Sequence, residues 1–364
     1  MSTLDALHDA AGVRWSATAF GRVPRNYGDP AAEYEAARND VVVTDRADRR
    51  LVRVHGRDPI RMIQGLISND IANAPADRAV YATALTPKGK MVADMRVLRH
   101  GPDLLLDVDA AAADAMMSHL RKFVPPLFAK FEDVSAAWGE IGVYGPGARR
   151  VVMKLFDIEI REEVVEDQLH ATSVDDEPVL IMATANFDVP GFDLIMPAAL
   201  LDRAWRELTA AGARPAGHAT LDVLRIEAGR PRWGAELTET TIPLEAGLRD
   251  RAISDVKGCY TGQEVIIRIL HRGHVNWLLR RVLMGGAAAP AKDTALVSQG
   301  EGKKVGRITS AAWSPKWQQT IGLGYVRREV ELGAEVHLES VDGPLVAITS
   351  PDAAPVIQNG PGRH

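Results

Sequence analysis

Nine consecutive residues, KGCYTGQEV (257–265), bring together side chains that could do chemistry. They include Cys259, the only cysteine of the chain, with Gly258 and Gly262 on either side of it. A thiol near the ammonium of Lys257 ionises more easily, because the positive charge favours the thiolate. Glycines at this spacing let the backbone adopt conformations closed to other residues, or let a ligand approach closely. The segment therefore suits a reactive thiol. The plainer alternative is a turn that opens a helix and buries an inert cysteine.

A basic stretch follows this segment within about twenty residues. Its members are Arg268, His271, Arg272, His274, Arg280 and Arg281. In a chain whose formal net charge is −5, such a cluster could receive an anionic ligand tail or an acidic partner. A basic face that is merely solvated is the alternative.

Length and composition set limits on the protein class. With 364 residues, 46% of them apolar and 25% charged, the chain should form two or three ordinary globular domains. The net charge of −5 and the pI near 6.1 argue against a protein dedicated to binding nucleic acid. A single cysteine excludes an internal disulfide framework and a Cys-rich metal or cluster site made by one chain, so we predict no metal site.

The N-terminus gives no sign of export. It carries Asp5, His8 and Asp9 where a signal peptide needs an unbroken apolar run. No stretch approaches the ~18 apolar residues that span a bilayer. We therefore expect a cytoplasmic protein with no membrane partner, in agreement with its single cysteine.

The first 45 residues predict few regular elements. Residues 3–11 favour a short helix, and residues 12–30 read as irregular. A helix should begin at Pro30, with Asp29 as its cap. The apolar run VVVTD (41–45) is typical of a short buried strand.

The next part of the chain contains two similar stretches. VHGRDPIRMI begins at residue 54 and VYGPGARRVV at residue 143, and each passes from a strand through glycine into a helix. A predicted hairpin and an amphipathic helix follow in both cases, so each copy reads β-α-β-β-α, a ferredoxin-like unit. We place the pseudo-repeats at about 41–125 and 138–213, with a closing segment at 214–277.

After KGCYTGQEV and the helix expected behind it, the sequence changes from helical patterns to short β-rich runs. A helix is expected within 218–234 and another over 264–273, so KGCYTGQEV lies at a loop-to-helix junction whose backbone N–H groups could face an anion. Short β-rich runs with turn residues then predict a small barrel over 278–352, and 353–364 reads as a loose tail. The predicted organisation is thus a region 1–277 followed by a barrel domain.

KGCYTGQE resembles the signature of the YgfZ family of folate-binding proteins. That family is related to the T-protein of the glycine cleavage system, an aminomethyltransferase that uses tetrahydrofolate. Further similar stretches extend the resemblance over about residues 28–340. They are GDPAAEYEAAR, VVVTDRADRRLVRVHGRD, LISNDI (66–71), LRIEAGRPRWG (224–234), IPLEAGL (242–248) and VGRITSAAWSPKWQQTIGLGYV (305–326).

The resemblance implies an α+β T-protein-like fold, with two ferredoxin-like units around a folate channel and a C-terminal β-barrel. The cofactor would be tetrahydrofolate or a one-carbon derivative of it. Glu227 matches the acidic residue that binds the pterin, where a carboxylate accepts two hydrogen bonds. The alternative is a helix glutamate paired with a nearby arginine. The other implied folate-binding residues are Asn69, Asp70, Lys257, Gly258, Tyr260, Gly262, Gln263, Glu264 and Arg272.

One stretch departs from the T-protein pattern. T-proteins carry two adjacent acids within the segment that corresponds to ALTPKGKMVADMRV, one of them catalytic, and this chain has Ala93 followed by Asp94. The departure favours a YgfZ-type role, in which a folate-binding protein takes part in iron–sulfur protein assembly or repair. Cys259 would then be a functional thiol, and client iron–sulfur proteins or assembly factors would be partners. One alternative is a tetrahydrofolate-dependent aminomethyl- or methyltransferase with Asp94 as the acid. The other is a non-catalytic RNA- or protein-binding module that uses 268–281.

Overall fold

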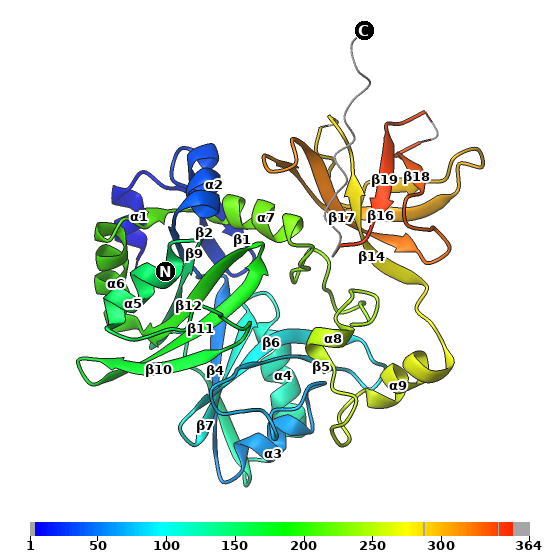
Figure 1. Ribbon diagram of the computed structural model, residues 1–364. Coiled ribbons are helices and arrows are strands. Elements are labelled where there is room, and N and C mark those ends of the chain that lie inside the picture. The colour runs from blue at the N-terminus through cyan, green and yellow to red at the C-terminus, as the bar shows by residue number, and fades with distance from the viewer. Residues whose placement is uncertain (1–3, 287, 341, 352–364) are drawn as a thin grey trace.

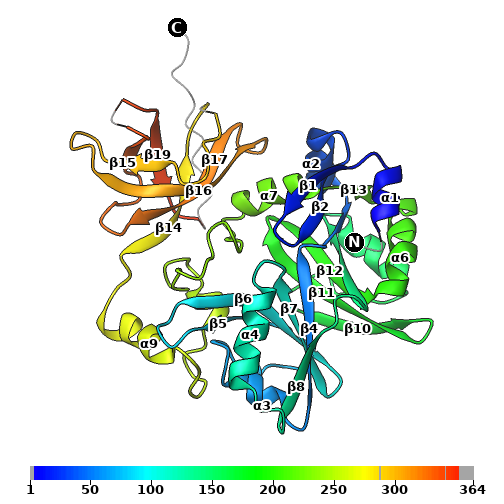
Figure 2. The ribbon, with the colours of Figure 1, turned by 180° about the vertical axis from the view of Figure 1, so that it is seen from behind.

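The computed structural model describes residues 4–286, 288–340 and 342–351 (Figures 1 and 2). Its N-terminal part contains helix α1 (Asp5–Ala10) and helix α2 (Pro30–Asn39). The Asp29 side chain accepts a hydrogen bond from the Ala32 amide at 3.1 Å, so the predicted cap is confirmed. Between the helices, however, the chain forms a hairpin of β1 (Arg14–Thr18) and β2 (Gly21–Asn26) where we expected irregular structure.

The first repeat folds as a five-stranded sheet with two helices. Its strand order is β5-β6-β7-β4-β8. The elements, in chain order, are β4 (Arg49–Gly56), α3 (Pro59–Gln64), β5 (Val80–Leu85), β6 (Met91–His100), β7 (Asp103–Asp109), α4 (Ala113–Phe123) and β8 (Ala129–Asp133).

The second repeat has the same element order in a six-stranded sheet. Its strand order is β10-β11-β12-β9-β3-β13, so that β3 (Val42–Asp45), from before the first repeat, lies between two of its strands. The other elements are β9 (Trp138–Tyr144), α5 (Ala148–Phe156), β10 (Leu169–Val174), β11 (Glu177–Phe187), β12 (Val189–Pro197), α6 (Ala198–Ala210) and β13 (Arg214–Pro215).

The predicted repeat is therefore confirmed in outline and extended in detail. Each copy holds a strand that we did not count, β5 or β10, which lengthens the predicted hairpin into three antiparallel strands. Buried charges join the two sheets: Arg96 of β6 bonds to Asp193 of β12 and to Glu140 of β9. All three side chains are less than one tenth exposed.

The closing segment and the barrel complete the structure. Helices α7 (His218–Glu227), α8 (Arg249–Ala252) and α9 (Gln263–Arg272) precede the barrel, and α7 packs against its strand β16 (Figures 1 and 2). The six barrel strands close in the order β14-β17-β16-β15-β18-β19. They are β14 (Trp277–Leu283), β15 (Ala295–Val297), β16 (Lys304–Ser314), β17 (Gln319–Arg327), β18 (Glu335–Leu338) and β19 (Leu345–Thr349).

The α+β fold with a C-terminal barrel is as predicted. The domain limit between 277 and 278 stays a prediction, and the predicted tail, 353–364, lies outside the described residues. Among the described helices, none has the length and apolar character needed to cross a bilayer.

Candidate active site

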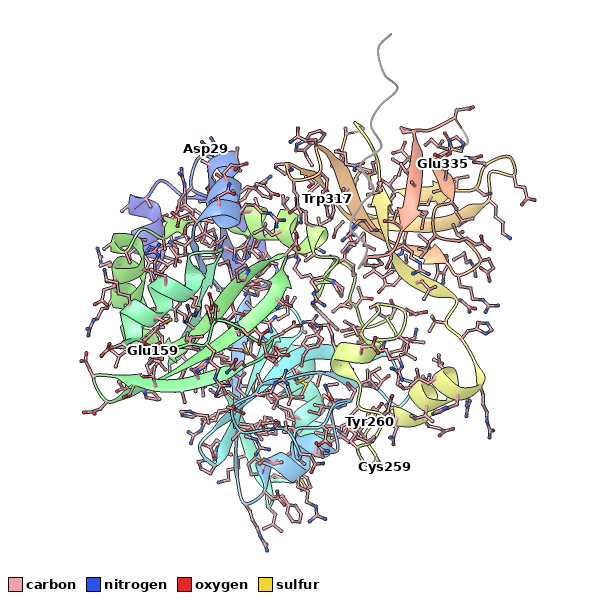
Figure 3. The ribbon with its side chains drawn as sticks, viewed as in Figure 1. Asp29, Glu159, Cys259, Tyr260, Trp317 and Glu335 are labelled. Atoms are coloured by element: carbon pink, nitrogen blue, oxygen red, sulfur yellow. The ribbon has the colours of Figure 1, made fainter. Side chains whose placement is uncertain are left out.

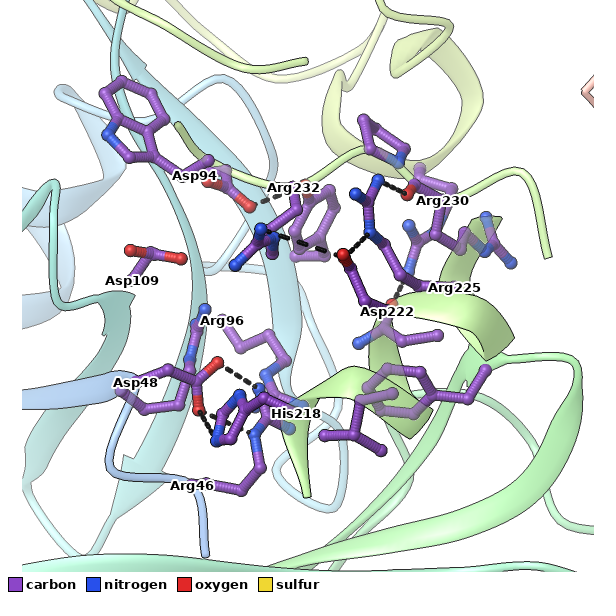
Figure 4. A pocket seen from close by; sticks show the side chains of 18 residues that line it. Arg46, Asp48, Asp94, Arg96, Asp109, His218, Asp222, Arg225, Arg230 and Arg232 are labelled. Carbon is purple, nitrogen blue, oxygen red and sulfur yellow. Dashed lines mark hydrogen bonds and ion pairs between the residues drawn. The ribbon is translucent and has the colours of Figure 1, made fainter. Parts of the chain in front are cut away.

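A pocket lies where the first sheet, helix α7 and the loop after α7 meet (Figure 4). Strands β5, β6 and β7 contribute Tyr81, Asp94 and Asp109, and the end of β11 contributes Asn186 and Phe187. Eleven of the residues that line it are arginines or aspartates. They are Arg46, Asp48, Arg49, Asp94, Arg96, Asp109, Asp222, Arg225, Arg230, Arg232 and Arg251.

Asp94 is the predicted site residue that this pocket contains. Its Oδ2 accepts a hydrogen bond from the Tyr81 hydroxyl at 2.9 Å, whereas its buried Oδ1 has no partner among the described residues. The residue is 8% exposed. Burial raises the pKa of Asp94, although Arg49 and the Tyr81 hydroxyl act in the opposite direction. A buried carboxyl with a free oxygen and a raised pKa can hold a proton and donate it.

The other charges of the pocket are mostly paired. Arg46 bonds to Asp48 at 3.0 Å. Burial acts to raise the pKa of Asp48, but Arg46 and His218 outweigh it and hold that pKa below its ordinary value. Arg251 bonds to Glu166, whose carboxylate lies outside the pocket lining. These pairs position the pocket wall and compensate the charges that burial would otherwise penalise.

The KGCYTGQEV segment lies away from this pocket. The Lys257 ammonium donates hydrogen bonds to the carbonyl oxygens of Gln64, Ile67 and Asn69 at 2.5–2.9 Å. The ammonium is therefore held by the backbone between α3 and β5, and its effect on the thiol of Cys259 stays a prediction. Cys259 itself is exposed, and Figure 3 labels it on the loop near α9, in the lower right part of the view.

Of the two glycines of this segment, Gly262 serves close packing, whereas a Cβ on Gly258 would meet no atom within 4 Å. Gly262 has φ of +84°, and a Cβ there would lie 2.6 Å from the Thr86 carbonyl oxygen. The Thr261 amide donates to Gly65 and the Gln263 amide donates to Tyr260, so neither is free for an anion. Close approach of two backbones thus explains Gly262 better than contact with a ligand does.

The remaining residues predicted near the signature have local partners. Asn69 donates to the carbonyl oxygens of Tyr81 and Arg251, and Asp70 accepts from Gln64. Through Asn69 the segment supports the backbone of two pocket-lining residues. The others lie around the loop and α9: Gly258 is exposed, Tyr260 is buried with its hydroxyl unpartnered in the described structure, Glu264 pairs with Arg268 at the surface, and Arg272 is exposed.

Comparison with known proteins agrees with this architecture. A model of the GCVT N-terminal domain matches residues 4–254, and one of the glycine cleavage T-protein C-terminal barrel domain matches residues 279–352. The chain belongs to the glycine cleavage T-protein family. The sequence resemblance is therefore confirmed at this level, whereas membership of the YgfZ group stays a prediction.

Relatives in the T-protein family match nearly the whole chain. An aminomethyltransferase of Rubrobacter xylanophilus is 30% identical over 347 residues, covering 94% of this chain and 91% of that protein. One of Cupriavidus necator is 27% identical over 372 residues, covering 98% and 97%. The crystal structure of glycine cleavage system aminomethyltransferase T from Bartonella henselae gives a TM-score of 0.86 at 21% identity over 96% of both chains, which shows the shared fold alone.

Glu227, the predicted pterin ligand, does not line the pocket described above. The Tyr34 hydroxyl donates to both of its carboxylate oxygens, at 2.9 and 3.1 Å, and Arg38 and Ser314 also bond to it. These partners come from α2 and from β16 of the barrel, and Glu227 is 2% exposed. Both oxygens are thus engaged where α2, α7 and the barrel meet, and the role of Glu227 as a pterin ligand stays a prediction.

The basic stretch 268–281 is divided by the fold. Arg268 and Arg272 lie on α9, whereas Arg281 is 2% exposed within the barrel and donates to the Glu227 carbonyl oxygen at 2.8 Å. Burial also lowers the pKa of Arg280. The stretch therefore does not present one continuous basic face.

Several pocket residues were missed at the sequence level. Asp109 and Trp233 line the pocket, as does Arg49 at the start of β4. The position of Asp109 as the last residue of a strand, LLLDVD, was an available signal, since polar residues at strand ends often face a site. Trp233 follows α7 in the GRPRWG loop, and its place in the pocket depends on contacts that sequence spacing does not reveal.

Proposed function

We propose that this protein is a tetrahydrofolate-dependent aminomethyltransferase. Its active site would be the pocket between the first sheet and α7, called the central pocket below, with Asp94 as the acid. The observation that carries the proposal is the Asp94 carboxyl, which is buried in the pocket with Oδ1 unpartnered in the described structure. Aminomethyl transfer ends in the departure of an amine, which must gain a proton. A carboxyl whose pKa burial has raised keeps its proton to a higher pH than an exposed carboxyl does and can supply it to the amine.

The residues of the pocket fit a reduced folate. The side chains of Phe187, Leu221 and Trp233 form an apolar surface that suits a flat ring system. Asp94 Oδ1 is a buried polar atom with no hydrogen-bond partner in the described structure. Arg232, whose side chain is 51% exposed, stands where an anionic tail could reach it. Tetrahydrofolate, when bound, supplies the nitrogen that takes up the one-carbon unit. The names of the relatives, which are aminomethyltransferases, support the same assignment.

The chain's own groups prepare Asp94 for this step. The Tyr81 hydroxyl occupies Oδ2 at 2.9 Å, which fixes the carboxyl plane and leaves Oδ1 to carry the proton. The ion pairs of Arg46 with Asp48 and of Arg251 with Glu166 hold the surrounding walls. Such preorganised groups require little rearrangement during the reaction.

The decisive experiment combines binding with a single turnover. Tetrahydrofolate binding is measured by calorimetry, and ammonia release from an aminomethyl thioether is followed with bound tetrahydrofolate. Asp94→Asn should bind tetrahydrofolate within a few-fold of wild type but release ammonia roughly 10²–10⁴-fold more slowly. The control is Asp103→Asn, a buried aspartate on β7 outside the pocket, paired with Arg53. No binding by the wild type, or an unaffected rate in Asp94→Asn, would refute the proposal.

A second candidate function follows from the exposure of Cys259. A surface thiol can contact a client protein, as a YgfZ-type role in iron–sulfur protein assembly or repair would require. The test is complementation of iron–sulfur enzyme activity in a deletion strain by wild type, Cys259→Ser and Asp94→Asn. Loss in Cys259→Ser alone would favour this role, whereas loss in Asp94→Asn alone would favour chemistry in the pocket.

A further inference from the structure

Two carboxyls lie side by side in the proposed active site. Strands β6 and β7 are antiparallel, with Met95 opposite Val108. The next position in this register places Asp94 opposite Asp109, and such cross-strand neighbours have Cβ atoms about 4.5–5.5 Å apart. Both side chains line the same pocket, as Figure 4 shows, and Asp109 is 6% exposed.

Neither carboxyl has an ion-pair partner within 4 Å among the described residues. Arg49 lies opposite Asp109 in the register of β4 and β7, but it bonds to Asp107 at 2.6 Å. Asp109 Oδ1 accepts only the Ala111 amide, at 2.9 Å, in the described structure. Burial raises the pKa of Asp109 to about 6 despite Arg49, and the charges of Asp48 and Asp94 add to that rise.

Many other charged or titratable groups face this pair from the surrounding elements. They come from the segment before β4, from strands β4 to β7, from α7 and its following loop, and from α8. They are Arg46, Asp48, Arg49, Tyr81, Arg96, Asp107, His218, Asp222, Arg225, Arg230, Arg232 and Arg251.

We propose that Asp109 is a positioning residue for the acid: the two carboxyls share one proton, and Asp109 helps to keep that proton available to Asp94. This inference rests on the transferase function proposed above. Two carboxyls this close do not both ionise readily, so the pair loses its two protons in separate steps. The pair can then hold one proton at a pH where a lone carboxyl would be ionised.

The proton balance of the transfer closes on this pair. Transfer from an aminomethyl thioether breaks both the carbon–sulfur and the carbon–nitrogen bond, and the carbon forms a bond to each of two folate nitrogens, which together release two protons. The departing amine takes the proton from Asp94 and leaves as ammonia. The sulfur leaves as a thiol with one of the two released protons, and the carboxyl pair takes up the other. Asp109 also lines the adjoining pocket beside β1 and the start of α7.

The first test is the pH dependence of single-turnover ammonia release in Asp109→Asn. Without the neighbouring carboxyl, the pKa of Asp94 should fall, which lowers its protonated fraction above that pKa. The alkaline limb of the rate profile should shift to lower pH, with a several-fold loss of rate on that limb, and the rate should return to within a few-fold of wild type in acid. The control, Asp103→Asn, should leave the limb in place. An unmoved limb in Asp109→Asn, or loss of rate at every pH, would overturn the proposal.

A second measurement does not depend on activity. The carboxyl ¹³C resonance of Asp94, assigned through Asp94→Asn, is titrated in wild type and in Asp109→Asn. A lower midpoint in the variant supports the shared proton even if the wild type transfers no aminomethyl group, in which case only the proposed function fails. Identical midpoints in the two proteins overturn the inference, whatever the activity.

Discussion

The central pocket and the Cys259 loop use their polar groups in opposite ways. In the loop, the Lys257 ammonium is bonded to three backbone carbonyls, and the Thr261 amide is bonded to a fourth. In the pocket, Asp94 keeps an unpartnered Oδ1 within the described structure, and burial raises the pKa of both Asp94 and Asp109. The loop contains the more distinctive sequence, whereas the pocket contains the groups that are available to a ligand.

This difference separates stabilising groups from reactive ones. A polar group whose bonds are all made within the chain stabilises the fold and has little left to offer a substrate. Burial destabilises the ionised form of a carboxyl, so a buried carboxyl is stabilised when it holds a proton or bonds to a ligand. A distinctive motif can therefore mark a packing requirement near a site, and here the loop supports pocket residues through Asn69.

The largest expected effect concerns Glu227, which belongs with the fully paired groups. Glu227→Ala should lower the free energy of unfolding by about 3–5 kcal/mol, because it leaves the Arg38 guanidinium without its buried partner. Chemical denaturation measures this loss, with the exposed Glu35→Ala on α2, the helix that carries Arg38, as a control. A loss below about 1 kcal/mol together with a tenfold drop in tetrahydrofolate affinity would return Glu227 to the role of a pterin ligand.

A somewhat smaller loss is expected on removing the Lys257 ammonium. Lys257→Met keeps much of the aliphatic length but leaves three carbonyl oxygens without a donor, which should cost roughly 2–3 kcal/mol. Urea denaturation gives the value, and Lys88→Met, at an exposed position in the turn between β5 and β6, is the matched control. Unchanged stability with faster or slower alkylation of Cys259 would instead mean that the ammonium acts on the thiol.

Local sequence patterns were enough to predict much of this fold. Alternation and glycine positions located both repeats, and the pair Asp29–Pro30 located the start of α2. The β1–β2 hairpin was missed because its residues, RWSAT and GRVPRN, alternate poorly and include a proline. Insertion of β3 into the second sheet was also unpredictable, because a local sequence pattern does not show which distant strand will pair with it.

The site was less predictable than the fold, for the same reason. A family pattern pointed to both Asp94 and Glu227, but only Asp94 lines the pocket, because the pattern does not show which way a helix turns its side chains; both functional roles stay predictions. Asp109 escaped notice because its importance depends on a neighbour across the sheet. Sequence reasoning thus found a single acid, and only the strand register reveals the pair.

Replacement of the pocket residue Asp109 should raise the free energy of unfolding, whereas the substitutions of Glu227 and Lys257 should lower it. The folded-state pKa of Asp109 is about 6 against an ordinary 3.8, so its contribution to stability is fully present below 3.8 and is lost as the pH rises through about 6. Asp109→Asn removes this loss and should raise the free energy of unfolding by about 1–2 kcal/mol at pH 8, with little change at pH 3.5. Asp103→Asn, which breaks an ion pair with Arg53, should not stabilise at either pH. A gain that is equal at both pH values would contradict the ionisation argument.

The smallest effect on stability is expected at Cys259, and it makes the comparison sharpest. The thiol is exposed, so Cys259→Ser buries no hydroxyl and should change the free energy of unfolding by less than about 0.5 kcal/mol. Because the chain has one cysteine, iodoacetamide labelling followed by mass spectrometry reports on this thiol alone, and native protein should label nearly as fast as urea-unfolded protein. Ammonia release should be unchanged in Cys259→Ser, since the thiol lies away from the pocket. Protection of the native thiol from labelling, together with a loss of stability in Cys259→Ser, would show that the loop buries its sulfur. The Cys259 loop would then no longer combine fully bonded backbone contacts with an accessible thiol, and its contrast with the pocket would not hold.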